Sequence, residues 1–335
     1  MGEAAPLVDV WRGEMVESRH RGHAVIADAR GQVIAAWGDP AAVIYPRSSC
    51  KMLQALPLLE SGAGAGLSSE RLALACASHK GAAIHVSRVA AWLADLGMGD
   101  ADLRCGPQVP DDAPERHRLR DAGEAPCQLH NNCSGKHAGF LTLTRHLRAG
   151  SEYVEIGHPV QVAVRAAFEE MTGEASPVWA IDGCSAPNFA CTVAGLATAA
   201  ARMGDPSGLG ATRGAAARAL VDAMRAHPLL VSGVGGACSE LMAAMGGRVA
   251  VKTGAEAVFL AILPERGLGV ALKIEDGATR GSECAITALL ARLGAIDSAA
   301  PAAARRMTPI LPNRRGVPAA RIAPNPALWE GGAAI

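Results

Sequence analysis

The sequence predicts an α+β protein in which an antiparallel sheet is built from both ends of the chain and a helical region is inserted between them. β-rich runs occur near the N-terminus and again toward the C-terminus, whereas helical spacing of apolar residues dominates the middle. With 335 residues, half of them apolar, the chain can bury a sizeable core. We expect one unit over residues 1–335, with a sheet subdomain of approximately 1–47 and 245–335 and a helical subdomain of approximately 48–244.

The N-terminal region is predicted to contain a β-hairpin. Two β-rich runs, His23–Asp28 and Gln32–Trp37, flank a turn that ends in Gly31. Glycine supplies the positive φ that a tight hairpin turn requires. Pro46 then precedes apolar residues at helical spacing, so we expect a helix that begins at Ser48.

The remaining elements follow the same patterns. Helices are predicted over Ser68–Ala77, Val86–Leu96, His137–Leu147, Pro159–Met171, Ala190–Met203 and Thr212–Ala226. Three short strands (Arg248–Gly254, Ala257–Leu263 and Gly269–Glu275) precede an alanine-rich helix over Arg280–Leu293. The Ala/Pro-rich stretch Asp297–Ala304 is the candidate linker to a tail that begins at Arg305.

Composition and charge exclude several classes of function. Thirty-two basic and thirty-two acidic residues give a net charge of zero, and aromatic residues make up only 3% of the chain, so neither nucleic acid nor an anionic membrane is an expected partner. No apolar run reaches the roughly 18 to 20 residues of a membrane span. The acidic N-terminal region does not resemble a secretory signal. We expect a cytoplasmic protein that acts on a small molecule.

The nine cysteines are predicted to be free thiols, because a large cytosolic chain has no need of disulfides. Cys50, Cys76, Cys191 and Cys284 have apolar surroundings and are interpreted as small hydrophobic residues. Cys133 and Cys184 lie instead in polar, glycine-containing segments.

Ser48 and Lys51 are the first candidate catalytic pair. Residues three apart share one face of a helix, so the lysine nitrogen can reach the serine hydroxyl. A serine becomes a nucleophile at neutral pH only when a base takes its proton, and lysine can be that base. Backbone N–H groups near the helix start are candidates to hold an oxyanion.

A second pair is suggested by Lys252-Thr253-Gly254, which follows a β-rich run. Serine β-lactamases and penicillin-recognising enzymes carry such a segment after a Ser-x-x-Lys motif, and its glycine allows the strand to approach the substrate. The serine that would pair with Lys252 is Ser78. A helix-capping or buried structural hydroxyl is the alternative interpretation of Ser78.

Two cysteine segments are candidates for a metal site. Cys133 precedes an apolar helix and has Lys136 close by, conditions that favour a thiolate, which can attack a substrate or bind a metal. Asp182-Gly183-Cys184 is a similar loop, and the two cysteines could hold zinc if further ligands were supplied.

These residues resemble the Rhizobium etli type (class 3) L-asparaginases, also called the asparaginase II family. The similarity runs in order from about residue 16 to residue 294. It comprises Arg47-Ser48-x-x-Lys51, Cys76-Ala77-Ser78-His79, Asp102-Leu103-Arg104-Cys105-Gly106, Asn132-Cys133-Ser134-Gly135-Lys136-His137, His158-Pro159, Asp182-Gly183-Cys184-x-x-Pro187, His227-Pro228, Lys252-x-Gly254 and Lys273-Ile274-Glu275-Asp276-Gly277.

The resemblance implies a serine β-lactamase/glutaminase-like fold, a homodimer, and hydrolysis of L-asparagine to L-aspartate and ammonia. It implies two Ser-Lys tandems, Ser48 with Lys51 and Ser78 with Lys252, beside a zinc ion held by Cys133, Lys136 and Cys184. A lysine ligand must be neutral, so zinc binding should weaken as the pH falls.

We assign Arg47, His137 and Asp182 to substrate binding, Arg47 because guanidinium groups suit carboxylates. The alternative for Arg47 is a solvated or structural arginine. For His137 the alternatives are a histidine on the helix surface or one that supports the zinc ligands. After Ser78-His79 the family commonly has a small polar residue and then an acidic one, whereas Lys80-Gly81-Ala82 place a cation and no carboxylate here, so the preference for asparagine over glutamine stays open. The segment Ser232–Cys238 also lacks charged residues often found there. Two other functions remain: a thiol amidase that uses Cys133, and a non-catalytic amino-acid-binding domain.

Overall fold

A computed structural model, which describes residues 2–330 and 332, confirms the α+β class and the antiparallel sheet built from both ends of the chain. The chain forms two compact units. Unit 1 comprises residues 1–49, 191–208 and 240–335, and unit 2 comprises residues 50–190 and 209–239. The sheet lies in unit 1, whereas unit 2 is mainly helical.

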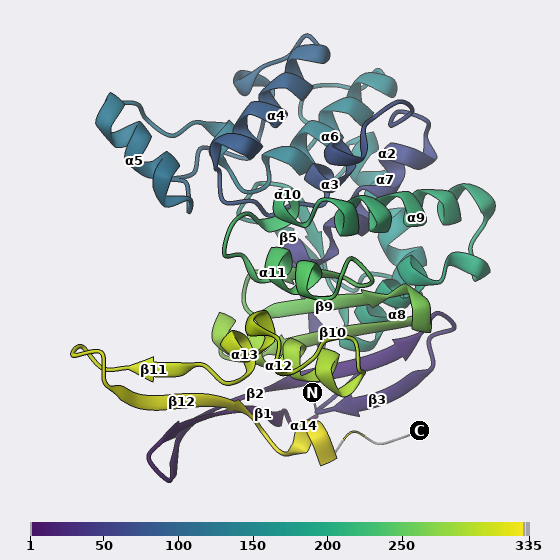
Figure 1. The fold of residues 1–335 in the computed structure, drawn as a ribbon. Helices are drawn as coiled ribbons and strands as arrows, with labels where there is room; N and C mark the ends of the chain where they lie inside the picture. The colour runs from purple at the N-terminus through teal and green to yellow at the C-terminus, as the bar shows by residue number, and fades with distance from the viewer. Residues whose placement is uncertain (1, 331, 333–335) are drawn as a thin grey trace. The chain divides into compact units, whose positions relative to one another are not determined.

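Unit 1 contains an eight-stranded antiparallel sheet in the order β11-β12-β1-β2-β10-β9-β8, with β3 also paired to β2 (Figure 1). Because β12 pairs with β1, the C-terminal segment joins the N-terminal strand directly. The strands are β1 (Ala5–Arg12), β2 (Met15–Asp28), β3 (Val33–Trp37), β8 (Ala250–Gly254), β9 (Val258–Leu263), β10 (Leu268–Ile274), β11 (Ile310–Pro312) and β12 (Pro318–Pro324). A small second sheet pairs β4 (Val43–Ile44) with β7 (Cys191–Thr192).

Helices α8 (Val193–Gly204) and α12 (Thr279–Arg292) pack against the eight-stranded sheet. Every residue of β9 is buried, as expected for a strand that is covered on both faces. Gly269 in β10 allows α8 to approach closely, since a Cβ there would lie 2.1 Å from the carbonyl oxygen of Ala197. The unit also contains α13 (Pro301–Met307) and α14 (Ala327–Glu330).

Unit 2 is built from short and medium helices with one hairpin, β5 (Trp179–Ile181) and β6 (Pro187–Phe189). Its helices are α1 (Lys51–Gln54), α2 (Leu56–Glu60), α3 (Ser69–Ala75), α4 (Ala83–Asp95), α5 (Ala113–Ala122), α6 (Ser134–His146), α7 (Pro159–Thr172), α9 (Ala211–Ala226) and α10 (Pro228–Ser232). Helix α11 (Ala237–Ala244) begins in unit 2 and ends in unit 1. Helix α6 is buried from Ser134 to Thr144, so it forms the centre of the unit.

Three predictions about the elements need correction. Ser48 lies in a 3-10 helix, Arg47–Cys50, and the α-helix starts only at Lys51 and breaks before Pro57, which has no N–H to continue it. The expected linker folds into α13, with Pro301 in its first turn. The predicted hairpin around Gly31 is confirmed as β2–β3, but β2 begins at Met15 and not at His23, and it forms an earlier hairpin with β1 around Gly13.

The segment 191–208 was expected in the helical part but belongs to unit 1, since its helix α8 packs on the sheet. None of the nine cysteines forms a disulfide within the described residues. No helix within the described residues is long and apolar enough to cross a membrane.

Candidate active site

Lys51 and Ser78 meet in the interior of unit 2. The Lys51 side chain is 1% exposed, and its amino group donates to the Ser78 hydroxyl at 3.0 Å. It also donates to the carbonyl oxygens of Ala77 and, at 3.5 Å, Asn132. The contact joins one member of each predicted tandem: the lysine of the first and the serine of the second.

Tight packing between α3 and α6 places these groups together. Ser78 follows the end of α3, and its N–H donates to Val231 O at 2.9 Å. At Gly135 in α6, an added Cβ would lie 2.4 Å from Leu74 O, so only glycine allows α6 to come this close to α3. The glycine between Ser134 and Lys136 therefore sets the spacing between the Ser78 loop and the cysteine segment.

Cys133, Lys136 and Cys184 converge in unit 2. The Lys136 amino group donates to the Cys184 sulfur at 3.0 Å, and Cys133 hydrogen-bonds to the same sulfur. The Cys133 thiol also lies 3.0 Å from Oδ1 of Asn132. All three predicted metal ligands are buried.

The surroundings of the cluster favour a charged Cys184 sulfur beside a charged Lys136 amino group. The hydrogen bond from Cys133 and the charge of Lys136 hold the pKa of Cys184 well below its usual range. The same hydrogen bond, together with burial, raises the pKa of Cys133 to about 12. Burial opposes charge on Lys136, but the two cysteine sulfurs outweigh it and raise the pKa of Lys136.

His137 lies at the start of α6 next to this cluster and is fully buried, so it is not a surface histidine. Tyr153 accepts the N–H of Arg104 at 2.7 Å, and its hydroxyl oxygen lies 2.9 Å from His137 Nδ1. Nε2 of His137 has no hydrogen-bond partner among the described residues. Burial holds the pKa of His137 well below its usual range.

Cys184 is carried by the turn between β5 and β6. Asp182 accepts the N–H of Gly183 on its side chain at 2.7 Å and the N–H of Ser185 on its carbonyl at 2.8 Å. Ser185 adopts a positive φ of 69°, which bends the turn around Cys184. Asp182 therefore shapes the turn, and its charge also acts on Lys136.

The other predicted residues lie in unit 1. Ser48 belongs to the turn Arg47–Cys50, and Lys252 is a fully buried residue of β8 whose amino group donates to Thr253 O at 2.8 Å. A Cβ on Gly254 would lie 2.7 Å from Pro46 O, so this glycine lets β8 pass directly beside the turn that holds Ser48. Arg47 has a positive φ of 52°, a conformation uncommon outside glycine.

His79 follows Ser78 directly, and hydrogen bonds fix its side chain on both ring nitrogens. Its Nδ1 accepts the N–H of Gly81 at 3.1 Å, and its Nε2 donates to Ser134 Oγ at 2.9 Å, whose hydroxyl donates onward to Leu129 O. These partners fix a neutral imidazole, and burial holds the pKa of His79 well below its usual range.

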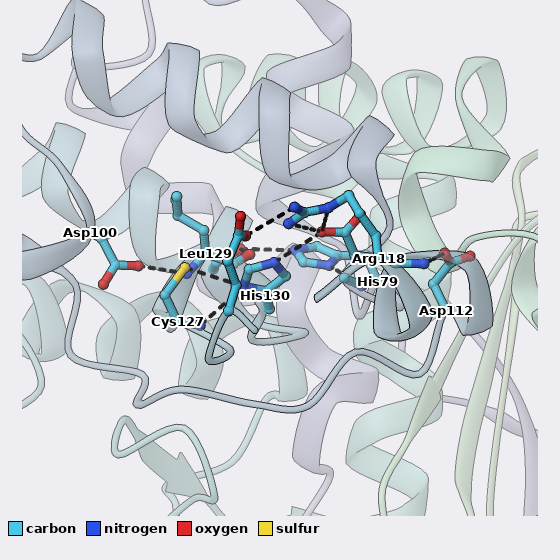
Figure 2. A network of polar contacts seen from close by, with 11 residues as sticks. His79, Asp100, Asp112, Arg118, Cys127, Leu129 and His130 are labelled. Carbon is cyan, nitrogen blue, oxygen red and sulfur yellow. Dashed lines mark hydrogen bonds and ion pairs between the residues drawn. The ribbon is translucent and has the colours of Figure 1, made fainter. Parts of the chain in front are cut away.

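Figure 2 shows His79 with a neighbouring network around His130. His130 donates to Glu115 Oε1 at 3.4 Å, and Arg118 donates to the same carboxylate oxygen at 2.9 Å. Nδ1 of His130 lies 3.2 Å from the Cys127 sulfur. Burial raises the pKa of Cys127, so this thiol is not prepared as a nucleophile.

Sequence reasoning missed Tyr153 and the supporting role of His79. Tyr153 is one of only two tyrosines in an aromatic-poor chain, which is a signal for a buried hydroxyl with a specific partner. His79 directly follows Ser78, but neighbours in sequence reveal nothing about a partner such as Ser134.

As a metal site, the cluster offers two soft sulfur ligands and an amine, three of the four positions of a tetrahedral zinc ion. The unpartnered Nε2 of His137 marks a polar atom in the same buried region without a protein partner in the described chain. No group of three or more His, Cys, Asp or Glu residues suited to a metal occurs in residues 2–330 and 332.

Comparison with known proteins places the chain in a family. Among solved structures, it is similar to a β-lactamase from Mycobacterium bovis (16% identity, TM-score 0.46, 81% of this chain and 94% of that one). It is also similar to Mglu in its tris and glutamate form (17% identity, TM-score 0.40, 88% of this chain and 63% of that one). No curated protein matches. The L-asparaginase II family matches residues 8–324, nearly the whole chain, and the protein belongs to that family.

Proposed function

We propose that the protein is an L-asparaginase, which hydrolyses the side-chain amide of L-asparagine to L-aspartate and ammonia through a serine nucleophile. Membership of the L-asparaginase II family supports amide hydrolysis. The observation that carries the serine mechanism is the buried contact between the Lys51 amino group and the Ser78 hydroxyl at 3.0 Å. The partners of Lys51 are the Ser78 hydroxyl and two backbone carbonyl oxygens, all of them neutral.

In this proposal, Ser48 attacks the side-chain carbonyl carbon of asparagine while Lys51 takes the hydroxyl proton. The two serines can exchange these roles, and the observed contact of Lys51 is with Ser78. The tetrahedral intermediate then collapses: the C–N bond breaks, and the nitrogen leaves as ammonia after it receives a proton relayed through Ser78, which Lys252 polarises. Water attacks the resulting aspartyl ester, returns a proton to Ser48 and releases aspartate. Backbone N–H groups close to Ser48 hold the oxyanion.

Substrate binding is assigned to Arg47, Asp182 and His137. Arg47 pairs with the α-carboxylate, a role that suits a guanidinium fork. Nε2 of His137 has no described protein partner, which leaves it available for a hydrogen bond with a polar substrate atom.

Cys133, Lys136 and Cys184 are proposed to hold a zinc ion, and the chemistry of these three donors supports the proposal. Bound zinc would polarise and fix the substrate amide, since the serine already supplies a nucleophile. Lys136 must lose a proton to become a ligand, so binding releases protons and weakens as the pH falls. The homodimer implied by the family resemblance stays a prediction.

Ammonia release from L-asparagine, compared with release from L-glutamine, tests the proposed function. A chain that is thermally stabilised by asparagine but releases no ammonia would be an amino-acid-binding domain. A thiol amidase is tested by exchange of the nucleophile: the serine mechanism predicts that Ser48→Ala abolishes ammonia release and that Cys133→Ala retains measurable turnover. The reverse pattern would establish Cys133 as the nucleophile.

A further inference from the structure

Three hydrogen bonds attach the segment Leu229–Val234 to residues 78–85, the segment that begins with Ser78. His85 Nε2 donates to Leu229 O at 3.2 Å, and the Ser78 N–H donates to Val231 O at 2.9 Å. The Lys80 amino group donates to Val234 O at 2.7 Å. Along residues 229–234, the acceptors of the His85 and Lys80 bonds therefore lie on either side of Val231, which accepts the Ser78 bond.

The segment continues into a glycine loop, Ser232–Gly236, whose N–H groups make two local bonds, from Gly233 to Leu229 O at 2.8 Å and from Gly236 to Gly233 O at 3.2 Å. Gly233 and Gly235 have positive φ values of 88° and 70°, and Val234 between them is 73% exposed. A Cβ at Gly233 would lie 3.3 Å from Lys80 Cγ, so the lysine stem packs directly on this residue. Glycines contribute no side-chain packing and have a large conformational entropy, so such a loop depends on bonds from outside.

Lys80 is suited to hold the glycine loop through its bond to Val234 O. Its carbonyl oxygen accepts the N–H of Asp112 at 3.0 Å, so its backbone is held on the opposite side. No carboxylate forms an ion pair with it in the part of the chain that the structure describes. The Val234 carbonyl is therefore not competing with an acidic side chain for the ammonium.

We infer that Lys80 is a positioning residue: by fixing the glycine loop through Val234 O, it keeps Val231 O in place to hold the Ser78 backbone and thus the Ser78 hydroxyl against Lys51. The inference rests on the proposed function of Ser78. The physical reason is that a shift of about 1 Å in a reacting group can lower the rate by roughly 10²-fold. A loosened but still folded loop should cause a smaller loss.

The test compares three variants of the full chain. Lys80→Met keeps an apolar stem over Gly233 but removes the donor, and Lys80→Arg restores a donor. Arg116→Met is the matched control, because it also removes a side-chain cation that donates to a backbone carbonyl, Pro110 O at 2.8 Å, in the same unit.

Two measurements are made on each variant: amide hydrogen exchange of the peptide that covers residues 229–236, and kcat and KM for asparagine. We expect faster exchange and a roughly tenfold lower kcat in Lys80→Met, with a smaller change in KM. Both should be largely restored in Lys80→Arg and unchanged in Arg116→Met. Unchanged exchange in Lys80→Met would overturn the tether, and faster exchange with unchanged kcat would overturn its effect on Ser78.

Hydrogen exchange does not depend on the reaction. If the unmodified chain releases no ammonia from asparagine, the proposed function fails, whereas the exchange data still decide whether Lys80 fixes the glycine loop.

Discussion

Lys51 and Lys136 are both buried lysines of unit 2, but their surroundings differ. Lys51 is 1% exposed and donates to a serine hydroxyl and two backbone carbonyls, all neutral. Lys136 is 3% exposed and donates to the Cys184 sulfur, whose pKa is held low by Cys133 and by Lys136 itself. A side chain with neutral partners can exchange a proton with a substrate group, whereas one paired with a thiolate is held as a charge.

The comparison indicates that the hydrogen-bond partner of a buried lysine, and not burial alone, decides whether it can transfer a proton. On this account Lys51 serves proton transfer and Lys136 serves the thiolate cluster. Variants of the two lysines separate these roles, and variants of Gly135 and His79 test the packing around them.

The largest effect is expected for Lys51→Met. Removal of the amine should lower kcat for asparagine by roughly 10³-fold, because general-base catalysis by a positioned group contributes on this scale. Steady-state ammonia release measures the effect, and a circular dichroism spectrum checks that the chain is folded. A variant with most of the original activity would exclude Lys51 as the base.

Gly135→Ala should destabilise the chain, because its Cβ would meet Leu74 O at 2.4 Å. A cost of about 1–3 kcal/mol in the free energy of unfolding is typical of overpacking, measured by urea denaturation. Gly139→Ala in the same helix is the control. Its Cβ would have no neighbour closer than 3.5 Å, so we expect no loss of stability. Equal stability of the two variants would mean that the approach of α6 to α3 is not tight.

Lys136→Met should affect the metal more than the serine chemistry. We expect loss of bound zinc and a roughly 10–100-fold lower activity, well short of the loss in Lys51→Met. Metal analysis of the purified protein, together with ammonia release, measures both. In the unmodified chain, zinc affinity should fall as the pH falls, since Lys136 and the cysteines must lose protons to bind. Affinity independent of pH would argue against Lys136 as a ligand.

The smallest effect concerns His79, which borders the Ser78 loop. Its folded-state pKa is lowered, so the unfolded chain binds a proton more readily, and stability is lost as the pH falls below the unfolded value of about 6.5. This histidine should contribute a loss of up to about 1.4 kcal/mol per pH unit in that window. His79→Gln should flatten the dependence by about one proton in urea denaturation at pH 7 to 5. An unchanged slope would show that His79 is not a buried neutral histidine.

Much of the fold could be predicted from the sequence. The strands β8, β9 and β10 and the helices α7, α9 and α12 lie within a few residues of their predicted bounds, because their apolar periodicity coincides with burial. The strands β1 and β12 were missed, since their pairing joins residues 8–11 to residues 321–324, and such distant pairing leaves no local pattern. The helix break before Pro57 was not predicted, because the apolar residues on both sides of the proline keep helical spacing.

The candidate site was only partly predictable. Sequence reasoning proposed Cys133, Lys136 and Cys184 together, and they do meet in unit 2. It could not find the contact between Lys51 and Ser78, because this depends on how closely α6 approaches α3 at Gly135. Nor could it find the bond from Lys80 to Val234, which joins residues 154 positions apart.

The central claim is that a lysine with neutral partners serves a serine nucleophile. Acid quenching of the enzyme during turnover of L-asparagine, followed by intact-mass analysis and peptide mapping, locates the aspartyl adduct. The account predicts an ester on Ser48 that disappears in Ser48→Ala. A thioester on Cys133, with no adduct on any serine, would contradict it.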